Sequence, residues 1–307
     1  MSDSRDAPFG LLVVDKPTEW TSHDVVKKVR HLTQTRKVGH TGTLDPLATG
    51  VLVLCIGRAT RLADALQANE KRYRGIVRFG TATTTYDREG EPTASGEIDF
   101  ERRDLEQALE PFSGEIRQRP PAWSALKLSG ERAFERARRG EEVVLEPRPV
   151  TIHSLTLTKW SPPDATIDVH CSSGTYIRSL AHDLGESIGC PAHLAGLRRT
   201  SCGAFDLDDA ASLEGLVANA ERDAWRSRLR PVSDGLPATW PSITVDSDGA
   251  RLLSHGHDVT IPDDVDLDDS ATCQLYGPDG RFLALASARA ERGELRPIKV
   301  FVKPGEC

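Results

Sequence analysis

Apolar and polar positions follow two periods along the chain, and each period predicts a different kind of element. Apolar runs at residues 10–15 and 51–56 predict buried strands, and partial alternation at residues 73–79 predicts a half-buried strand. Valines at helical spacing follow Thr21 and Asp24, a pair that fits a capping box, so a helix is expected there. Further helices are expected at residues 59–66, 101–112 and 175–188, and further strands at 151–160 and 165–171. Strands and helices in this irregular order predict an α+β fold.

The chain of 307 residues is long enough for two domains. After about residue 237 the pattern changes to short strands separated by Gly and Pro turns, which indicates a small β-rich domain at residues 237–307. The larger domain then covers residues 1–236. Within it, residues 119–149 form a proline-bounded, arginine-rich segment.

The charge of the chain is uneven. The net charge is −7, of which −5 lies from residue 236 onward, so the whole protein does not have the basic character typical of nucleic-acid binders. Two local stretches, residues 27–37 and 117–139, are nevertheless basic and could follow a phosphate backbone. Solvated helix faces would explain either stretch equally well. The acidic run at residues 263–269 predicts a surface loop that faces away from any RNA.

Several classes of protein are disfavoured by what the sequence lacks. No apolar run approaches the length of a membrane span, and no signal segment opens the chain. The six cysteines are scattered without a C-x-x-C pair, which argues against a zinc site or a disulfide framework and for a reducing cytoplasm. A phosphate-cradling loop, a dinucleotide fingerprint and an H-E-x-x-H pair are also absent, so we expect no metal or organic cofactor.

The stretch that carries candidate chemistry is residues 39–50, GHTGTLDPLATG. Its glycines allow tight turns, and the lone carboxylate of Asp45 stands just before a predicted buried strand. A reactive side chain on a loop backed by a rigid element is a common arrangement in active sites. The alternative is structural, because Asp45 followed by Pro46 also fits a helix N-cap.

Residues 39–50 closely resemble the catalytic-aspartate motif of the TruB family of tRNA pseudouridine-55 synthases. Further segments resemble the same family and occur in its order. They are Lys16-Pro17, residues 71–73 (KRY), 120–127 (PPAWSALK), 173–180 (SGTYIRSL) and 196–200 (GLRRT). The resemblance extends from about residue 10 to 207, and the C-terminal part looks like a small PUA-like RNA-binding module. The resemblance also identifies the arginine-rich segment at residues 119–149 as an insertion.

The resemblance implies three catalytic residues. Asp45 matches the nucleophile. A carboxylate can form a covalent intermediate, which divides one difficult reaction step into two easier ones. Arg178 matches the arginine that pairs with this carboxylate, a role for which a guanidinium is suited. Tyr73 matches the active-site tyrosine, whose ring could stack on uracil and whose phenol could help to remove a proton. Without the resemblance, a core tyrosine and a surface ion pair would be the simpler interpretations.

The resemblance also implies residues that bind the substrate. His40 matches the side chain that fills the base stack after the target uridine has been flipped out. Leu197 matches a leucine of the pocket wall, and Lys16, which with Pro17 also matches the family, is assigned to the residues that bind the substrate. Tyr176 is a further candidate for the pocket wall, although it could simply pack the start of a helix. Trp123 departs from the family, which has tyrosine here, and its N–H cannot accept a hydrogen bond as a hydroxyl can.

Together these features predict a pseudouridine-synthase catalytic domain with a mixed, mainly antiparallel sheet, followed by the PUA-like domain. The implied reaction is isomerisation of uridine 55 in the T stem-loop of tRNA by a cytoplasmic monomer that needs no obligate protein partner. Whether Asp45 attacks C1′ of the sugar or C6 of the base stays open. Two rivals are a non-catalytic RNA-binding or RNA-folding protein and a synthase that acts within a guide-RNA particle.

Overall fold

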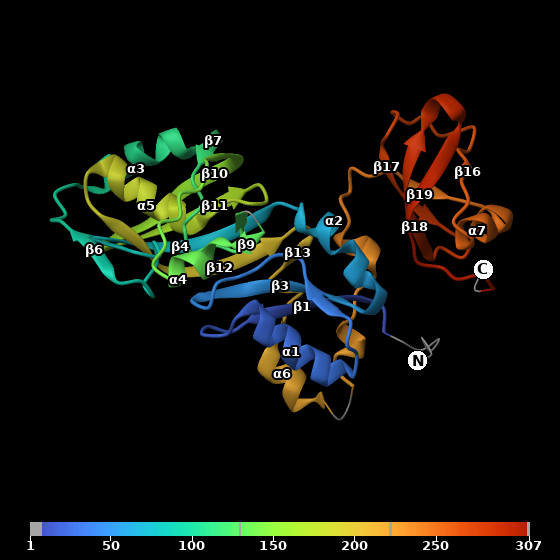
Figure 1. The fold of residues 1–307 in the computed structure, drawn as a ribbon, viewed down its shortest axis with the longest axis horizontal. Helices are drawn as coiled ribbons and strands as arrows, with labels where there is room; N and C mark the ends of the chain where they lie inside the picture. Colours follow the sequence, from blue (N-terminus) through green and yellow to red (C-terminus); the bar gives the residue numbers. More distant parts are fainter. Residues whose placement is uncertain (1–7, 129, 221–222, 306–307) are drawn as a thin grey trace.

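The computed structural model describes residues 8–128, 130–220 and 223–305. The molecule is elongated, with a large sheet domain at one end and a small sheet domain at the other (Figure 1). Among the described residues, no helix has the length and apolar character needed to cross a membrane.

The large domain is built on one mixed sheet, in the order β14-β1-β3-β12-β4-β11-β10-β7. The strands of this path are β1 (Gly10–Lys16), β3 (Ala48–Ile56), β4 (Lys71–Phe79), β7 (Gly114–Gln118), β10 (Arg148–Ser161), β11 (Asp164–Cys171), β12 (Ala192–Cys202) and β14 (Ala211–Ser212). The pairs β1–β14 and β3–β12 are parallel and the other pairs along the path are antiparallel. β2 (Val38–His40) pairs with β3, and β13 (Phe205–Asp206) pairs with β12. The predicted α+β class and mainly antiparallel sheet are confirmed.

The apolar runs of β1 and β3 are continuous because this half of the sheet is buried on both faces. Alternate side chains such as Leu12 and Leu52 join a core that contains α1 (Ser22–Thr33), α5 (Ile177–Ile188) and α6 (Leu213–Ala218). Their neighbours, such as Val13 and Val51, face a second cluster with the 3-10 helix Gly57–Leu62 and α2 (Ala63–Gln67). β4 is buried at every second residue, as its alternating sequence predicts.

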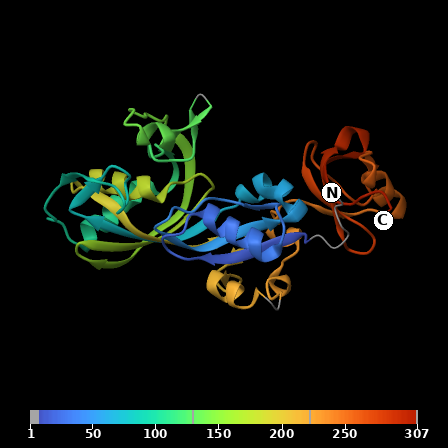
Figure 2. The same ribbon diagram turned by 60° about the horizontal axis from the view of Figure 1, so that its bottom comes forward.

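Helix α3 (Arg102–Leu109) packs with α5 on one face of the large sheet (Figure 1). The predicted insertion contains β8 (Lys127–Leu128), β9 (Glu131–Arg132) and α4 (Ala133–Arg138). Figure 2 shows this segment standing off the large sheet. A separate hairpin of β5 (Thr81–Thr83) and β6 (Pro92–Ser95) precedes α3.

The small domain has a five-stranded sheet in the order β15-β17-β18-β19-β16, accompanied by α7 (Ser247–Ser254). Its strands are β15 (Ser242–Thr244), β16 (Val259–Thr260), β17 (Thr272–Tyr276), β18 (Phe282–Arg289) and β19 (Glu294–Val300). The β-rich C-terminal domain is thus confirmed. The acidic run at 263–269 lies in a mostly exposed loop, as expected. The boundary at residue 236 falls in the connection between the two sheets and stays a prediction.

The sequence patterns placed most elements within a few residues. The helix expected at 59–66 begins as a 3-10 turn, and the helix expected at 101–112 ends in one. The capping box of Thr21 and Asp24 is present at the start of α1. Strand β12 was not predicted, although it lies in the middle of the sheet.

Candidate active site

Asp45 lies on a tight turn that leads directly into β3. Its carbonyl accepts a hydrogen bond from the N–H of Ala48, 3.0 Å away, and β3 begins at Ala48. No helix starts here, so the alternative that Asp45 is a helix N-cap is wrong. The turn instead presents the carboxylate on a loop that a buried strand holds in place, and 36% of the side chain remains exposed.

Lys16 supports this turn through hydrogen bonds to its backbone and to neighbouring carbonyls. Its side chain is fully buried, and its ammonium donates to the carbonyls of Pro17, at 2.9 Å, and of Pro46, at 3.3 Å, and to that of Trp20. Burial lowers the pKa of Lys16 to about 8, with Asp45 acting in the opposite direction. Through these contacts Lys16 holds the Asp45 loop in place, and none of its side chain is exposed.

Arg178, in the first turn of α5, pairs with Asp45. Its Nε lies 2.9 Å from Oδ2 and its Nη2 lies 3.4 Å from Oδ1 of the carboxylate. The guanidinium is 5% exposed and also donates to the carbonyls of Thr85, at 3.1 Å, and Trp123, at 2.9 Å. The pairing that the resemblance implied is therefore present in the structure.

Asp87 is a second carboxylate at this arginine, and sequence reasoning missed it. Its Oδ2 lies 3.5 Å from Nη1 of Arg178, and the residue is 3% exposed. Asp87 accepts hydrogen bonds from the Thr85 hydroxyl, at 2.6 Å, and from the N–H of Glu89, at 3.0 Å. The signal was weak, because one aspartate after a run of threonines reads as an ordinary turn.

Burial and charge act against each other at Asp45. Burial raises the pKa of the Asp45 carboxyl, the Arg178 guanidinium lowers it, Asp87 raises it and Lys16 lowers it. The net direction is upward, so the ionised carboxylate depends on its cationic partners.

Tyr73 is the third residue of β4 and lies between Val169 of β11 and Arg199 of β12. It is 9% exposed, and burial raises its pKa to about 12, with the positive charge of Arg199 acting in the opposite direction. Arg199 is itself 1% exposed, and its guanidinium donates to the carbonyls of Val51, at 2.6 Å, and Gly42, at 3.2 Å. Arg199 therefore connects Tyr73 to the loop that carries Asp45, a role that sequence reasoning did not assign to it.

His40 ends β2 and is half-buried on the same loop. Its Nδ1 accepts a hydrogen bond from the N–H of Gly42 at 3.3 Å, which leaves the proton of the neutral ring on Nε2. Burial lowers its pKa, and the nearby Arg199 lowers it further, so the ring is neutral at pH 7. A neutral, flat ring on a loop can enter a base stack without the cost of desolvating a charge.

Tyr176 and Leu197 complete the predicted set. Tyr176 caps α5, and its backbone N–H and carbonyl both pair with the Gln118 amide, at 2.7 and 3.0 Å. Burial raises the pKa of the Tyr176 phenol, and Ser124 of the insertion lowers it. Leu197 is half-buried on β12, where it pairs with Ala48 at the end of the Asp45 turn. These contacts place both residues beside the elements that carry Asp45 and Arg178.

Comparison with known proteins identifies the family to which this site belongs. The model of the TruB family pseudouridylate synthase N-terminal domain matches residues 30–177, and that of the tRNA pseudouridylate synthase B C-terminal domain matches residues 178–236. The chain belongs to the TruB family of pseudouridylate synthases. It is 51% identical over 250 residues to tRNA pseudouridine synthase B of Solibacter usitatus (strain Ellin6076), covering 81% of this chain and 85% of that protein. It is 43% identical over 301 residues to the protein of the same name from Thermobifida fusca (strain YX), covering 95% and 98%.

Solved structures agree on the fold of this TruB family member. A Cbf5-Nop10-Gar1 complex contains a chain with a TM-score of 0.76 at 24% identity, covering 99% of this chain and 92% of that one. An H/ACA RNP bound to a substrate RNA containing 2′-deoxyuridine gives a TM-score of 0.75 at 24% identity, covering 97% and 86%. At this identity the likeness establishes the fold alone.

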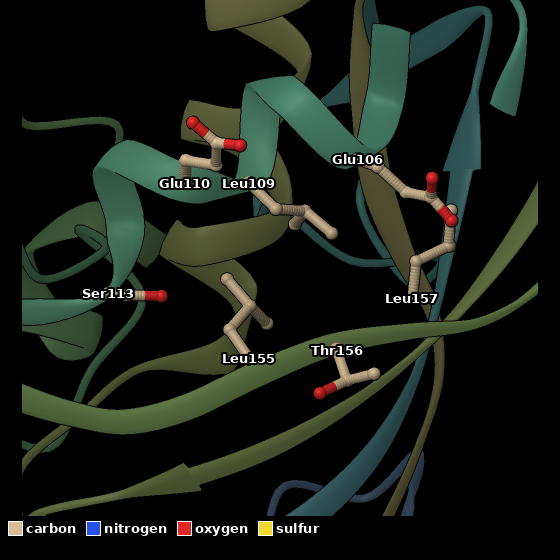
Figure 3. Close-up of a pocket in the computed structure, with 7 residues that line it drawn as sticks. All are labelled: Glu106, Leu109, Glu110, Ser113, Leu155, Thr156 and Leu157. Carbon is tan, nitrogen blue, oxygen red and sulfur yellow. The ribbon is translucent and has the colours of Figure 1, made fainter. Parts of the chain in front are cut away.

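A separate hollow of about 300 Å³ lies between α3 and β10 (Figure 3). It is lined by Glu106, Leu109, Glu110, Ser113, Leu155, Thr156 and Leu157. None of the residues grouped around Asp45 contributes to it, so the hollow is not part of the candidate active site.

Proposed function

We propose that this chain isomerises uridine to pseudouridine at position 55 in the T loop of tRNA, with Asp45 as the nucleophile. The observation that carries the proposal is the ion pair between Asp45 and Arg178, built on the loop that matches the family's aspartate motif. Relatives named tRNA pseudouridine synthase B match nearly the full length of the chain, which supports the substrate. A protein that only bound RNA would not need a buried arginine to orient a partly exposed carboxylate.

The reaction breaks the bond between N1 and C1′, turns the base and joins C5 to C1′. The C5 proton is released, N1 gains a proton, and no electrons are transferred, so the chemistry itself requires no redox group. Asp45 supplies the nucleophile, and attack at C1′ and attack at C6 both remain open. Burial raises the pKa of Tyr73 to about 12, so its hydroxyl is neutral at pH 7. For Tyr73 to act as a base, the adjacent Arg199 cation would have to stabilise its phenolate.

Other residues would bind and hold the flipped uridine. His40 would fill the vacated stack, and Leu197 and Tyr176 would form part of the wall against the base. Lys16 would act through the Asp45 loop, since its ammonium is fully committed to backbone carbonyls. The insertion at 119–149 would close on the RNA. Its Trp123 carbonyl already accepts a hydrogen bond from Arg178, which supports a link between closure and the catalytic pair.

We also propose that the protein acts as a cytoplasmic monomer on the T stem-loop of tRNA, with residues 237–307 as an RNA-binding domain. Cys55, Cys171, Cys190, Cys202 and Cys273 are all free and buried, which fits a reducing compartment. The basic segment at 117–139 supplies phosphate contacts near the site. Cys307 lies outside the described residues.

The decisive experiment measures release of tritium from tRNA labelled at uridine C5, in the presence of a chelator. We expect wild type to release about one equivalent and Asp45→Asn to release none, because an amide is not a nucleophile here. Asp168→Asn is the matched control, since Asp168 pairs with Arg74 at the exposed surface and should leave release unchanged. Release by Asp45→Asn at the wild-type rate would overturn the assignment of the nucleophile. Tight tRNA binding without release by wild type would favour an RNA-binding protein instead.

A further inference from the structure

Two histidines and a glutamate form a cluster that the proposed reaction does not use. Glu70 stands immediately before β4, His170 lies near the end of β11, and His153 lies on β10, three strands that are adjacent in the sheet (Figure 1). Nε2 of His170 is 2.7 Å from Oε2 of Glu70, and Nε2 of His153 is 3.2 Å from Oε1 of the same carboxylate. The cluster therefore draws one side chain from each of three neighbouring segments.

A break in the strand register turns His153 toward this cluster. Ile152 pairs with Cys171 and Ser154 pairs with His170, so His153 is an extra residue on β10 without an opposite partner on β11. Such a bulge re-aims a side chain relative to the regular alternation of the strand. The two imidazole rings are consequently on one side of the sheet, with centroids 4.7 Å apart.

The cluster lies on the opposite face of the sheet from Tyr73. Along β4 the odd-numbered residues from Lys71 onward are buried, and Arg72, which pairs with His170, is exposed. His170 therefore shares the outer face with Arg72, whereas Tyr73 and its partner Val169 point into the core. A ligand at the cluster would be separated from the Asp45 group by the thickness of the sheet.

We propose that Glu70, His153 and His170 bind a divalent zinc ion. Two imidazole nitrogens and a carboxylate oxygen are a known zinc-binding set, with metal–ligand bonds of about 2.0–2.2 Å and hence ligand atoms about 3.3 Å apart. The three ligand atoms here lie within 4.8 Å of one another, so small side-chain rotations bring them to that spacing. The exposed side of the cluster leaves a fourth position for water, as expected of a site with three protein ligands.

Bound zinc would act as a clip between β4, β11 and β10. The sequence argued against zinc because it has no C-x-x-C pair. It could not reveal this cluster, because two histidines 17 residues apart and a distant glutamate match no known zinc-binding spacing. Ile152, beside His153, also pairs with β7, which leads into the insertion. The clip would therefore stabilise the part of the sheet from which the insertion extends.

The test uses the untagged, full-length protein after removal of metal with a chelator, titrated with ZnCl₂ by calorimetry. We expect wild type to bind one equivalent, and His170→Ala and Glu70→Gln to lose more than about 100-fold in affinity, since a direct ligand matters more than its supporting groups. His31→Ala is the matched control, because it removes an exposed histidine of α1 and should bind zinc like wild type.

Two further measurements make the outcome unambiguous. Zinc should raise the melting temperature of wild type and of His31→Ala but not of Glu70→Gln, a nearly isosteric change at a side chain that is 55% exposed. Co²⁺ should give visible absorption in wild type that the His153→Ala variant lacks. Equal zinc affinity in wild type and Glu70→Gln, or no saturable binding by wild type, would show that the cluster is only a pair of surface ion pairs and would overturn the proposal.

Discussion

Arg178 is the residue at which several parts of the site meet. Its guanidinium contacts the carboxylates of Asp45 and Asp87 and the carbonyls of Thr85 and Trp123. A planar group with five donors can satisfy such a set, whereas the single ammonium of lysine cannot reproduce its fork. The side chain is therefore positioned by four acceptors before any substrate binds, and it positions Asp45 in turn.

Removing this cation should be costly for catalysis and should change its pH dependence. For Arg178→Gln we expect the single-turnover rate on a T-loop hairpin to fall by at least about 100-fold, since Asp45 loses its orientation. Arg178 lowers the pKa of Asp45, so its loss raises that pKa further and decreases the ionised fraction at any given pH. The acid limb of the rate profile, measured between pH 5 and 8, should move to higher pH. An unchanged acid limb would show that the ionisation of Asp45 does not control the rate at low pH.

Replacing Asp87 should move the acid limb of the pH–rate profile in the opposite direction, to lower pH. Its carboxylate raises the pKa of Asp45, so in Asp87→Asn that pKa falls and the ionised form persists to lower pH. The amide oxygen can still accept from Thr85 and Glu89, which limits the structural change. The measurement is the same rate profile, with Asp168→Asn as the surface control. A shift upward, or one equal to the control, would contradict this electrostatic role.

At the scale of elements, β12 is the strand that unites the site. It runs between β3 and β4, pairs Leu197 with Ala48, and sets Arg199 opposite both Gly50 and Tyr73. Gly50 has a φ of +101°, and a Cβ there would come within 2.2 Å of the Arg199 carbonyl oxygen. Only glycine allows this close approach of the two backbones.

Gly50→Ala should therefore separate β3 from β12. We expect the free energy of unfolding to fall by about 3 kcal/mol or more, from backbone strain together with the steric contact. Gly189→Ala is the control, because its φ of +77° carries strain but the added Cβ meets nothing within 4 Å. That variant should lose only about 1 kcal/mol. Urea unfolding of both variants provides the comparison, and equal losses would show that contact with Arg199 is unimportant.

The elements that the sequence predicted have side chains that follow one period. β4 alternates partly in sequence and completely in burial, and α1 carries valines on one face after its capping box. β12 escaped prediction because Arg198, Arg199 and Thr200 follow Leu197, and a fully buried arginine in a strand contradicts the usual pattern. Lys16 is likewise fully buried, and its contacts to backbone carbonyls could not be read from the sequence, since buried lysines are rare.

Site residues could be predicted where they lie within a sequence motif that resembles the family. Asp45 and Arg178, 133 positions apart, were paired by resemblance and are in contact in the structure. Asp87 and Arg199 were missed because their roles arise from tertiary contacts to Arg178 and to the Gly42 loop, which no local spacing reveals. The Glu70 cluster depends on a strand bulge and was equally invisible.

For the whole molecule, the two domains share one apolar cluster. Phe301 and Phe282 of the small domain pack with residues of the large domain such as Leu11 and Val53. Phe9 stacks on Phe301 with ring centroids 5.5 Å apart, and Arg61 donates to the carbonyl of Val300. The small domain is therefore docked on the large one rather than connected only by a linker.

Loosening this contact should affect large substrates selectively. For Phe301→Ala we expect the KM for full-length tRNA to rise about tenfold, because the small domain, which we propose binds RNA, no longer acts as one unit with the large domain. The rate on a minimal T-loop hairpin should be unchanged, since the Asp45 group is untouched. Ile298→Ala is the control, as Ile298 is 52% exposed on β19, three residues before Phe301. Equal effects on both substrates would argue that the small domain does not contact RNA.

The strand order also dictates when the site can assemble as the chain leaves the ribosome. β1, β2 and β3 emerge early, yet β2 pairs only with the end of β3, and residues 48–50 at the start of β3 have no partner on that edge until β12 has been made. β1 likewise waits for Ala211, which pairs with Val14. Contacts of such long sequence separation form slowly and leave strand edges open in the meantime. More than half of the 307-residue polypeptide must therefore appear before Asp45 and Arg178 can meet. A product truncated before Arg178 has no active site even though its catalytic loop is complete.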